Sequence, residues 1–331
     1  MTKRFDVVGI GNAMVDVLAR CEDDFLGEVG VEKGIMQLID MGRAVDLYGR
    51  VGPAREVSGG SAANTIAVVA SLGGSTAYVG KVKDDQLGAI FAHDLRAQGA
   101  VYETALATAK QKAETGRCIV LVTPDGERSM NTYLGVTEFL SPDDIDPDQM
   151  ADAAMIYLEG YRFDGPESHA AFAKAIDAAK GAGGKVSLTL SDPFCVERHR
   201  DAFREMLRDH VDLLFANRDE ICSMYETDDF EAALAAAADE IEIVACTESE
   251  KGAHILAGGQ RWHAPAKPVK VVDATGAGDA FAGAFLWAHS KGYPLDLCGR
   301  MGCAAASEVI SHIGARPEAD LKALFRADGL V

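Results

Sequence analysis

The stretch Val271-Val272-Asp273-Ala274-Thr275-Gly276-Ala277-Gly278-Asp279-Ala280-Phe281 decides the fold of this chain. We expect the apolar run 269–272 to form a buried strand, because a helical pattern begins directly after the turn that follows it. Gly276 and Gly278 allow a tight turn and let a ligand approach the backbone amides closely. A helix N-terminus carries unpaired N–H groups and a partial positive charge, so the turn Gly276-Ala277-Gly278 predicts an anion-binding site.

Asp279 falls in the first turn of the predicted helix, beside whatever the amides bind. A carboxylate next to an anion site indicates phosphoryl transfer, in which the amides hold the charge and the carboxylate accepts the proton of the acceptor. We also expect the helix N-terminus to lower the pKa of Asp279. The alternative is a strand–turn–helix connection in which Asp279 only caps the helix.

Composition limits the class of protein. The 331 residues are 48% hydrophobic and 25% charged, enough for one large α/β domain with or without a smaller accessory part. The formal net charge of −19 argues against nucleic acid or an anionic membrane as a partner, although amides and a metal can still bind phosphorylated ligands. The seven cysteines never form C-x-x-C, and no H-E-x-x-H pair occurs, so neither a disulfide framework nor a zinc site is expected.

Targeting signals are not evident in the sequence. The N-terminus lacks the apolar stretch of a signal peptide, and no segment approaches the roughly 18 consecutive apolar residues of a membrane span. We therefore expect a cytoplasmic protein.

Short apolar runs alternate with helical patterns along most of the chain. This alternation predicts a doubly wound, mostly parallel sheet flanked by helices, an α/β sandwich of three layers. Two stretches contain strand-like segments without helices between them, and the second includes a hairpin around Pro124-Asp125-Gly126. We expect them to form a small antiparallel sheet that acts as a lid. The predicted division is a core of residues 1–14, 41–100 and 135–331, and a lid of residues 15–40 and 101–134.

The first predicted strand ends in Gly9-Ile10-Gly11-Asn12-Ala13-Met14. A dinucleotide-binding turn is disfavoured because Met14 stands where the third glycine would be. Instead, Asn12 and Asp16 are expected at the carboxyl edge of the sheet, where open α/β sheets bind ligands. A carboxylate there can accept hydrogen bonds from two neighbouring sugar hydroxyls; the alternative is a solvated aspartate in a loop.

A second glycine turn, Gly59-Gly60-Ser61-Ala62-Ala63-Asn64, also precedes a helical pattern. It lacks the lysine of a Walker-type loop, and Asn64 offers both a donor and an acceptor, which suits a polyol. The alternative is a helix capped by Ser61. Further along, Asn217 and Glu220 share a helix face and suit a hydrated Mg²⁺, although the same pair is also good capping chemistry.

These motifs, in this order, resemble the ribokinase-like (PfkB) family of carbohydrate and nucleoside kinases, from about residue 5 to residue 317. Within the family the chain is most similar to adenosine kinases, through 11–16, 24–26, 59–64, 188–194 and 211–217. The resemblance implies that Asp279 is the base and that Gly276, Ala277 and Gly278 form the anion hole. It further implies a ribose site made by Asn12, Asp16, Gly59, Gly60 and Asn64.

The same resemblance implies ATP and Mg²⁺ as cofactors and leaves a monovalent cation such as K⁺ open. Asn217 and Glu220 would hold Mg²⁺ through water, and Asn217, Thr247 and Gly252 would border ATP. Arg128, on the predicted hairpin, would close over the phosphates. Phe194 is expected to stack on a base, with Tyr161 and Phe163 as alternatives. The polar position that meets the base falls near Met36-Gln37.

The sequence thus favours an ATP-dependent kinase acting on the 5′-hydroxyl of a ribonucleoside, with adenosine first. The first alternative is a kinase of the same family that acts on free ribose, fructose or a related sugar. A second is a nucleoside-binding module without catalysis, and a dehydrogenase is the most distant. The expected partners are small molecules, with the chain as a monomer or a homodimer.

Overall fold

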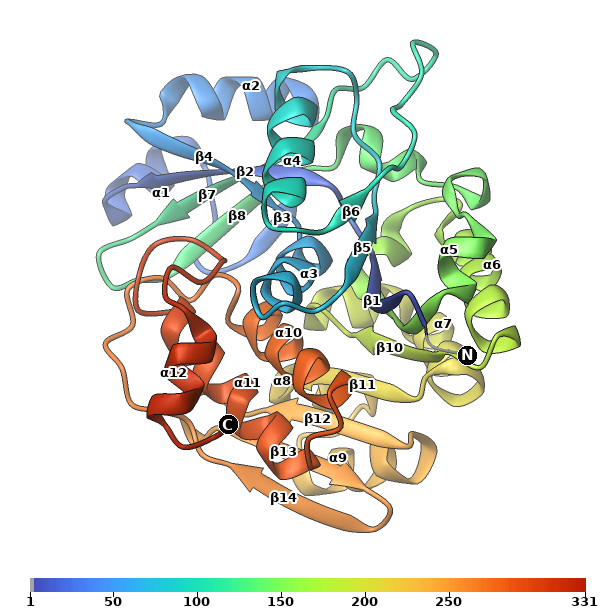
Figure 1. The fold of residues 1–331 in the computed structure, drawn as a ribbon. Coiled ribbons are helices and arrows are strands. Elements are labelled where there is room, and N and C mark those ends of the chain that lie inside the picture. Colours follow the sequence, from blue (N-terminus) through green and yellow to red (C-terminus); the bar gives the residue numbers. More distant parts are fainter. Residues whose placement is uncertain (1–2) are drawn as a thin grey trace.

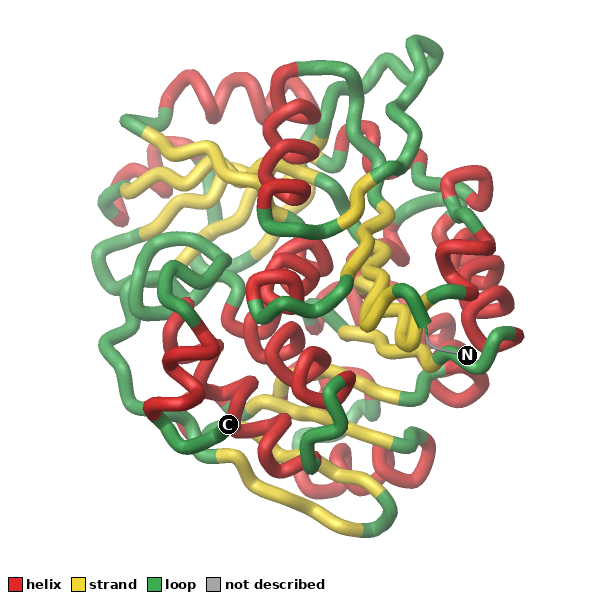
Figure 2. Tube along the Cα trace, viewed as in Figure 1, coloured by secondary structure: helices red, strands yellow, loops and turns green. Residues whose placement is uncertain are grey.

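Two sheets organise residues 3–331, the part of the chain that the computed structural model describes. Figure 1 shows the order of the elements, and Figure 2 shows the two sheets as separate groups of strands. The large sheet has nine strands in the order β14-β13-β12-β11-β10-β9-β1-β5-β6. These are Gln260–Ala264, Ala253–Ala257, Ile243–Thr247, Leu213–Asn217, Lys185–Thr189, Ala153–Glu159, Phe5–Ile10, Thr76–Val79 and Val101–Tyr102.

The strands from β12 to β6 are parallel, and β13 and β14 form an antiparallel edge. Their parallel carboxyl ends meet along one edge, as the predicted α/β fold requires.

Helices cover both faces of the large sheet. Neighbouring residues of a strand point to opposite faces, so the apolar side chains of a buried strand need a layer of helices on each side. Val7 of β1 packs in one cluster with α3, α4, α10, α11 and α12. Val8 packs in a second cluster with α6, α7, α8 and α9, and α5 joins the same layer. The bounds of these helices, in the order α3 to α12, are Ser61–Ser71, Gln86–Ala97, Pro147–Ala151, Ser168–Gly181, Pro193–His210, Arg218–Met224, Phe230–Glu240, Ala277–Ser290, Leu295–Val309 and Leu321–Ala327.

The small sheet has the order β3-β8-β7-β2-β4. Its strands are Met36–Leu38, Arg128–Tyr133, Gly116–Val122, Met14–Arg20 and Ala54–Gly59. The pairs β7/β8 and β2/β4 are antiparallel, whereas β2/β7 and β3/β8 are parallel. Helices α1 (Asp23–Val29) and α2 (Met41–Arg50) cover its outer face through Leu26, Val29 and Leu47. Its other face, which includes Met14 and Cys118, looks toward the large sheet.

Two strands do not lie in the sheet that the sequence predicted for them. β4 comes from the stretch 41–100 predicted for the core, but it pairs with β2 in the small sheet. β6 comes from the stretch 101–134 predicted for the lid, but it pairs with β5 in the large sheet. The first difference has a clear cause: Gly59 is the register partner of Met14, so the chain enters α3 directly from the small sheet.

The run 269–272 is not a strand, contrary to the prediction. The chain leaves β14 at Ala264 and crosses to α10 without pairing, and Val272 donates its N–H to the carbonyl of Ile310 at the end of α11. Val271 is 49% exposed, so this apolar run lines a pocket rather than a sheet. No helix within residues 3–331 is both long and apolar enough to cross a membrane.

Candidate active site

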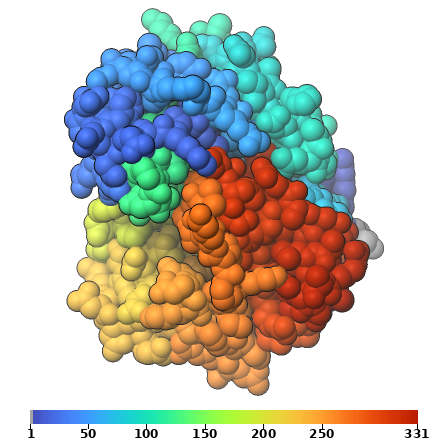
Figure 3. All heavy atoms as spheres, turned by 90° about the vertical axis from the view of Figure 1, so that its left-hand side faces the viewer, coloured from blue at the N-terminus to red at the C-terminus, as the bar shows by residue number. Residues whose placement is uncertain are grey.

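A pocket of about 830 Å³ lies between the small sheet and the carboxyl edge of the large sheet. In Figure 3 the blue and green atoms of the small sheet lie against the orange and red atoms of the C-terminal third. Most of the predicted site residues line this one pocket: Asn12, Asp16, Gly60, Asn64, Arg128, Asn217, Glu220, Thr247, Gly252, Gly276, Ala277, Gly278 and Asp279. Residues far apart in the sequence therefore meet at the edge that the fold predicts.

The turn before α10 is built to leave amides free. Gly276 has a φ of 77°, and a Cβ there would lie 2.5 Å from the carbonyl oxygen of Ala315. Within residues 3–331 the backbone N–H groups of Gly278 and Asp279 have no acceptor. Asp273, fully buried, supports the turn by accepting from the N–H and hydroxyl of Thr275. Free amides at the N-terminus of a helix of 14 residues form a suitable site for an anion.

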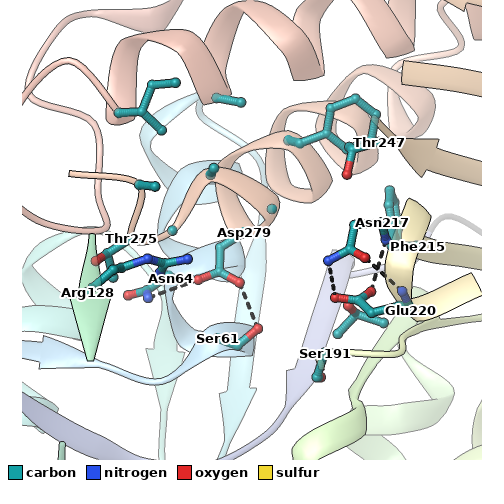
Figure 4. Close-up of a pocket in the computed structure, with 18 of the residues that line it drawn as sticks. Ser61, Asn64, Arg128, Ser191, Phe215, Asn217, Glu220, Thr247, Thr275 and Asp279 are labelled. Carbon is teal, nitrogen blue, oxygen red and sulfur yellow. Dashed lines mark hydrogen bonds between the residues drawn. The ribbon is translucent and has the colours of Figure 1, made fainter. Parts of the chain in front are cut away.

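Asp279 is held by two residues of α3 (Figure 4). The Ser61 hydroxyl donates to Oδ1 at 2.7 Å, and Asn64 Nδ2 donates to Oδ2 at 3.1 Å. Burial raises the pKa of Asp279 to about 6, against these two hydrogen bonds and the charges of Arg128 and Arg316. The expectation of a lowered pKa is therefore wrong, because loss of solvent outweighs the helix N-terminus.

Asp16 lies on β2 and faces the same pocket. Its side chain forms no hydrogen bond to another residue of 3–331, and burial raises its pKa to about 7. A Cβ on Gly59 would collide with this carboxylate, and a Cβ on Gly60 would collide with the carbonyl of Asn12. Gly59 therefore lets the end of β4 lie against Asp16, and Gly60 lets the start of α3 lie against the Asn12 backbone, although Gly59 itself does not line the pocket.

Asn12 lines the pocket, but its side chain is already occupied. Its Nδ2 donates to Glu159 at 2.9 Å, and its Oδ1 accepts from Arg162 at 3.0 Å. Glu159 also accepts from the N–H of Ala62 at the start of α3. Asn12 thus joins the ends of β1 and β9 to α3, and its predicted contact with a sugar would have to compete with these bonds.

The opposite end of the pocket holds Asn217 and Glu220. They form a capping box: Asn217 Oδ1 accepts from the Glu220 N–H, and Glu220 Oε2 accepts from the Asn217 N–H. Burial raises the pKa of Glu220 to about 8. The capping pair also lines the pocket beside Thr247. Helix capping and a place beside a hydrated Mg²⁺, the two interpretations of this motif, are therefore compatible. Gly252 has a φ of 98° and a Cβ would collide with the Ala264 carbonyl, so it shapes the turn after β12.

Arg128 begins β8 and projects from the small sheet toward Asn64 and Asp279 (Figure 4). Its guanidinium forms no hydrogen bond to another residue of 3–331. An unpaired cation that faces two carboxylates across an open pocket is well suited to meet an anionic ligand.

The small sheet supplies an apolar wall. Alternate residues face the pocket, so Met36, Leu38, Met130 and Leu134 line it together. Gln37 points the other way and donates to Asn131 at 2.6 Å. The polar contact expected near Met36-Gln37 is therefore not formed by Gln37.

Phe194 does not line the pocket, contrary to the prediction. Asp192 caps α7 by accepting from the N–H of Phe194, and the ring of Phe194 is 50% exposed. Phe163 packs in the core against Phe203, at 4.1 Å between ring centroids. Of the three aromatic residues named from the sequence, only Tyr161 lines the pocket.

Four residues support the site although the sequence analysis gave them no role: Glu159, Arg162, Asp273 and Arg316. Glu159 ends β9 and contacts Asn12 and Ala62, which are distant in sequence, so only the fold shows these contacts. Asp273 lies inside the quoted stretch, and its burial could have been suspected from the apolar residues before it.

Comparison with known proteins identifies the family of the chain. A model of pfkB family carbohydrate kinases matches residues 34–321. This chain belongs to the pfkB family. It is therefore a phosphotransferase with an alcohol group as acceptor, and kinases of this family use ATP, generally with Mg²⁺.

Individual pfkB relatives cover nearly the whole chain. A probable sugar kinase from Rhizobium etli is 48% identical, covers 99% of this chain and 100% of its own, and has a TM-score of 0.96. Adenosine kinase from Sinorhizobium meliloti is 47% identical, covers 98% and 99%, and has a TM-score of 0.94. Adenosine kinase from Saccharomyces cerevisiae is 27% identical over 93% of this chain and 95% of the yeast protein.

The residues at the Asn217 end of the pocket fit the Mg²⁺ that pfkB kinases generally use. Each carboxylate oxygen of Glu220 accepts one bond from Asn217 and keeps a lone pair, so it can accept from metal-bound water. A divalent cation nearby would also favour the charged form of Glu220, whose pKa burial raises.

Proposed function

We propose that this protein transfers the γ-phosphoryl group of ATP to the 5′-hydroxyl of a ribonucleoside, with adenosine as the preferred acceptor. The observation that carries the proposal is the position of three side chains around one pocket. Asp16, Asn64 and Asp279 all line it, and Asp279 stands beside the free amides of the α10 turn.

In the proposed reaction the acceptor hydroxyl gives its proton to Asp279 as its oxygen bonds to phosphorus and the bond to ADP breaks. A pKa of about 6 makes Asp279 a better base near neutral pH than an ordinary aspartate. The amides of Gly278 and Asp279 and the charge of Arg128 would oppose the negative charge on the phosphoryl oxygens. Mg²⁺, when bound, would neutralise charge on the ATP phosphates.

The apolar wall favours a nucleoside over a free sugar. Met36, Leu38, Met130 and Leu134 present hydrocarbon and thioether surface, which suits the face of a base and offers a monosaccharide no hydrogen bonds. The similarity to adenosine kinase from Sinorhizobium meliloti supports the same choice.

A sugar kinase remains the second candidate, because the probable sugar kinase from Rhizobium etli is 48% identical over almost the full chain. Phosphorylation of ribose or fructose would use the same Asp16, Asn64 and Asp279, but the apolar wall would then contact no part of the acceptor.

A panel of acceptors separates these functions. ADP release would be measured with ATP and Mg²⁺ in the presence of adenosine, inosine, guanosine, uridine, ribose or fructose, and the product identified by mass spectrometry. We expect a nucleoside 5′-monophosphate, formed fastest from adenosine. Faster turnover of a free sugar would replace the proposal with the second candidate. Adenosine binding without ADP release would indicate a module without catalysis.

A further inference from the structure

Arg316 is a cation beside the pocket that none of the sequence motifs includes. It lies in the loop between α11 and α12 and is only partly exposed. Its Nε donates to Asn64 Oδ1 at 3.0 Å. Its Nη2 atom is buried and has no hydrogen-bond partner within residues 3–331. A guanidinium brought so close to the site without a paired carboxylate needs an explanation.

The contact with Arg316 settles the orientation of the Asn64 side chain. Asn64 accepts from Arg316 through Oδ1 and donates to Asp279 through Nδ2 at 3.1 Å. A flipped amide would place its NH₂ against the guanidinium and its oxygen against the Asp279 carboxylate, so both contacts would become repulsive. Arg316 and Asp279 therefore act together on the Asn64 amide, and Arg316 fixes the end that the Asp279 carboxylate does not contact.

The loop that carries Arg316 is joined to the anion-binding turn. The N–H of Gly314 donates to Asp273 Oδ2 at 3.0 Å, and Asp273 Oδ1 accepts from Thr275. Ala315 contributes the carbonyl that excludes a side chain at Gly276. One short loop thus touches both the turn that holds free amides and, through Asn64, the carboxylate beside it.

Arg316 also balances charge. Burial raises the pKa of Asp16, and Arg316 is the strongest influence in the opposite direction. The same charge favours the ionised form of Asp279. The other titratable groups that influence one or both carboxylates are Cys118, Arg128, Tyr157, Glu159, Glu220 and Asp273. Of the groups within residues 3–331 named here, Arg128 and Arg316 are the cations; Arg128 is on the small sheet, whereas Arg316 comes from the C-terminal loop beside the turn.

We propose that Arg316 is a positioning residue of the phosphoryl transfer. It holds the Asn64 amide so that Nδ2 faces Asp279, and it brings a positive charge close to Asp16 and Asp279. This inference rests on the proposed function and names a residue through which that site is arranged; Arg316 itself need not touch the acceptor.

The variants Arg316→Gln and Arg316→Lys test the proposal in the full-length protein, with Arg55→Gln as the matched control. Arg55, on β4, makes only a long ion pair, at 3.9 Å, with Glu318 of the loop that carries Arg316, and both side chains are more than 60% exposed. We expect R316Q to lower kcat/KM for adenosine by roughly 10- to 100-fold, the cost of a misplaced catalytic group, with KM for ATP unchanged. R55Q should match the wild type.

Two further readouts separate positioning from simple support of the loop. The acid limb of the pH profile of kcat/KM should move to higher pH in R316Q and stay in place in R316K, which keeps the charge. In a double-mutant cycle measured above the acid limb of the profile, where the carboxylates are ionised in every variant, Asn64→Ala with R316Q should be no slower than Asn64→Ala alone. The Asn64 change already removes the hydrogen-bonded route from Arg316 to Asp279.

The outcomes are distinct. Additive effects in the cycle, or an unchanged pH profile in R316Q, would overturn the positioning role while leaving the kinase intact. If R316Q melts far below the wild type, R316K carries the test. Reduced kcat/KM of R316K at an unshifted melting temperature, with the acid limb in place, supports the positioning role, and wild-type kcat/KM overturns it. No ADP release by the wild type with any acceptor would overturn the proposed function and this inference together.

Discussion

Asp279 experiences two opposed influences on its protonation. Burial raises its pKa to about 6, whereas Ser61, Asn64, Arg128 and Arg316 favour the charged form. The result is a carboxylate that is ionised at neutral pH and still able to accept a proton. An aspartate fully exposed to water would be a much weaker base.

Replacing Asp279 with Asn should remove turnover and keep binding. We expect kcat for adenosine to fall by about 10²- to 10⁴-fold, the range of general-base catalysis, because the amide cannot take the proton. Adenosine affinity, measured by calorimetry, should stay near the wild-type value. Asp296→Asn on α11, which does not line the pocket, is the control. Near-normal turnover in D279N would rule out Asp279 as the base.

Asp16 should make the stability of the folded protein depend on pH in the direction opposite to that of most aspartates. Its pKa is raised to about 7, above the ordinary 3.8, so the folded state holds the proton more tightly than the unfolded state. Its contribution to stability is therefore full below about pH 4 and is lost as the pH rises through 7.

The variant Asp16→Asn mimics the protonated form, so it should unfold at a higher temperature than the wild type at pH 8. We expect a gain on the order of 1 kcal/mol or more in unfolding free energy at pH 8, shrinking toward zero at pH 4. Melting curves across this range are the measurement, and KM for adenosine should rise at the same time. A D16N protein less stable than the wild type at pH 8 would contradict the raised pKa.

At the scale of elements, the α10 turn shows why glycine positions are not equivalent. Gly276 has a φ of 77° and a Cβ would meet the backbone of Ala315 at 2.5 to 2.7 Å. Gly278, two residues on, has an ordinary φ and nothing within 4 Å of a Cβ. The first glycine is therefore needed for the turn itself, and the second only for the approach of a ligand.

The two alanine variants of this turn should separate stability from activity. Gly276→Ala should cost roughly 1–3 kcal/mol of unfolding free energy through strain and collision, and should lower kcat by displacing the free amides. Gly278→Ala should melt near the wild type but raise KM for ATP, because the methyl group occupies the anion side. Equal melting temperatures for both variants, measured side by side, would contradict this account.

At the scale of the whole molecule, the pocket exists only because two sheets face one another. The large sheet supplies Asp279 and the free amides through α10, and the small sheet supplies Asp16, Arg128 and the apolar wall. Neither unit contains a complete site. The chain order interleaves them, since β4 of the small sheet leads straight into α3 of the core.

Arg128 should therefore act across the interface between the two units. Arg128→Gln is expected to lower kcat by about 10²- to 10³-fold, as for loss of one preorganised donor to transition-state charge, with adenosine affinity little changed. Arg20→Gln on the exposed end of β2 is the matched control on the same sheet. Steady-state kinetics with both substrates varied would measure the effect, and unaltered kcat in R128Q would exclude a contact with the phosphates.

Local sequence was enough for most of the elements and for several parts of the site. The alternation of apolar strands and helical patterns predicted the parallel sheet, because burial on both faces requires continuous apolar runs. Gly276 to Asp279 could be recognised because a turn that frees helix amides needs small residues at fixed positions. Asn64 follows a glycine turn as expected, whereas Asp16, expected at the carboxyl edge of the large sheet, lies within β2 of the small sheet and reaches the same pocket from there.

The residues that depend on partners distant in the sequence could not be found in this way. Arg316 contacts Asn64 across 252 positions, and Gln37 turns away from the pocket only because β3 pairs with β8 in one register. Phe194 is exposed since Asp192 caps α7 in an orientation that the sequence does not specify. The run 269–272 has the composition of a strand, yet it pairs with no strand, and Val272 donates its N–H to the carbonyl of Ile310 at the end of α11.

The sequence by itself determined the fold class, the glycine turn before α10 and the position of Asp279 beside it, because these follow from local conformation and from burial patterns. Only the tertiary structure decided the protonation of Asp279, the orientation of Asn64 and the contribution of Arg316. Those properties depend on how much water is excluded and on which charges approach from other elements, and both are set when the chain packs.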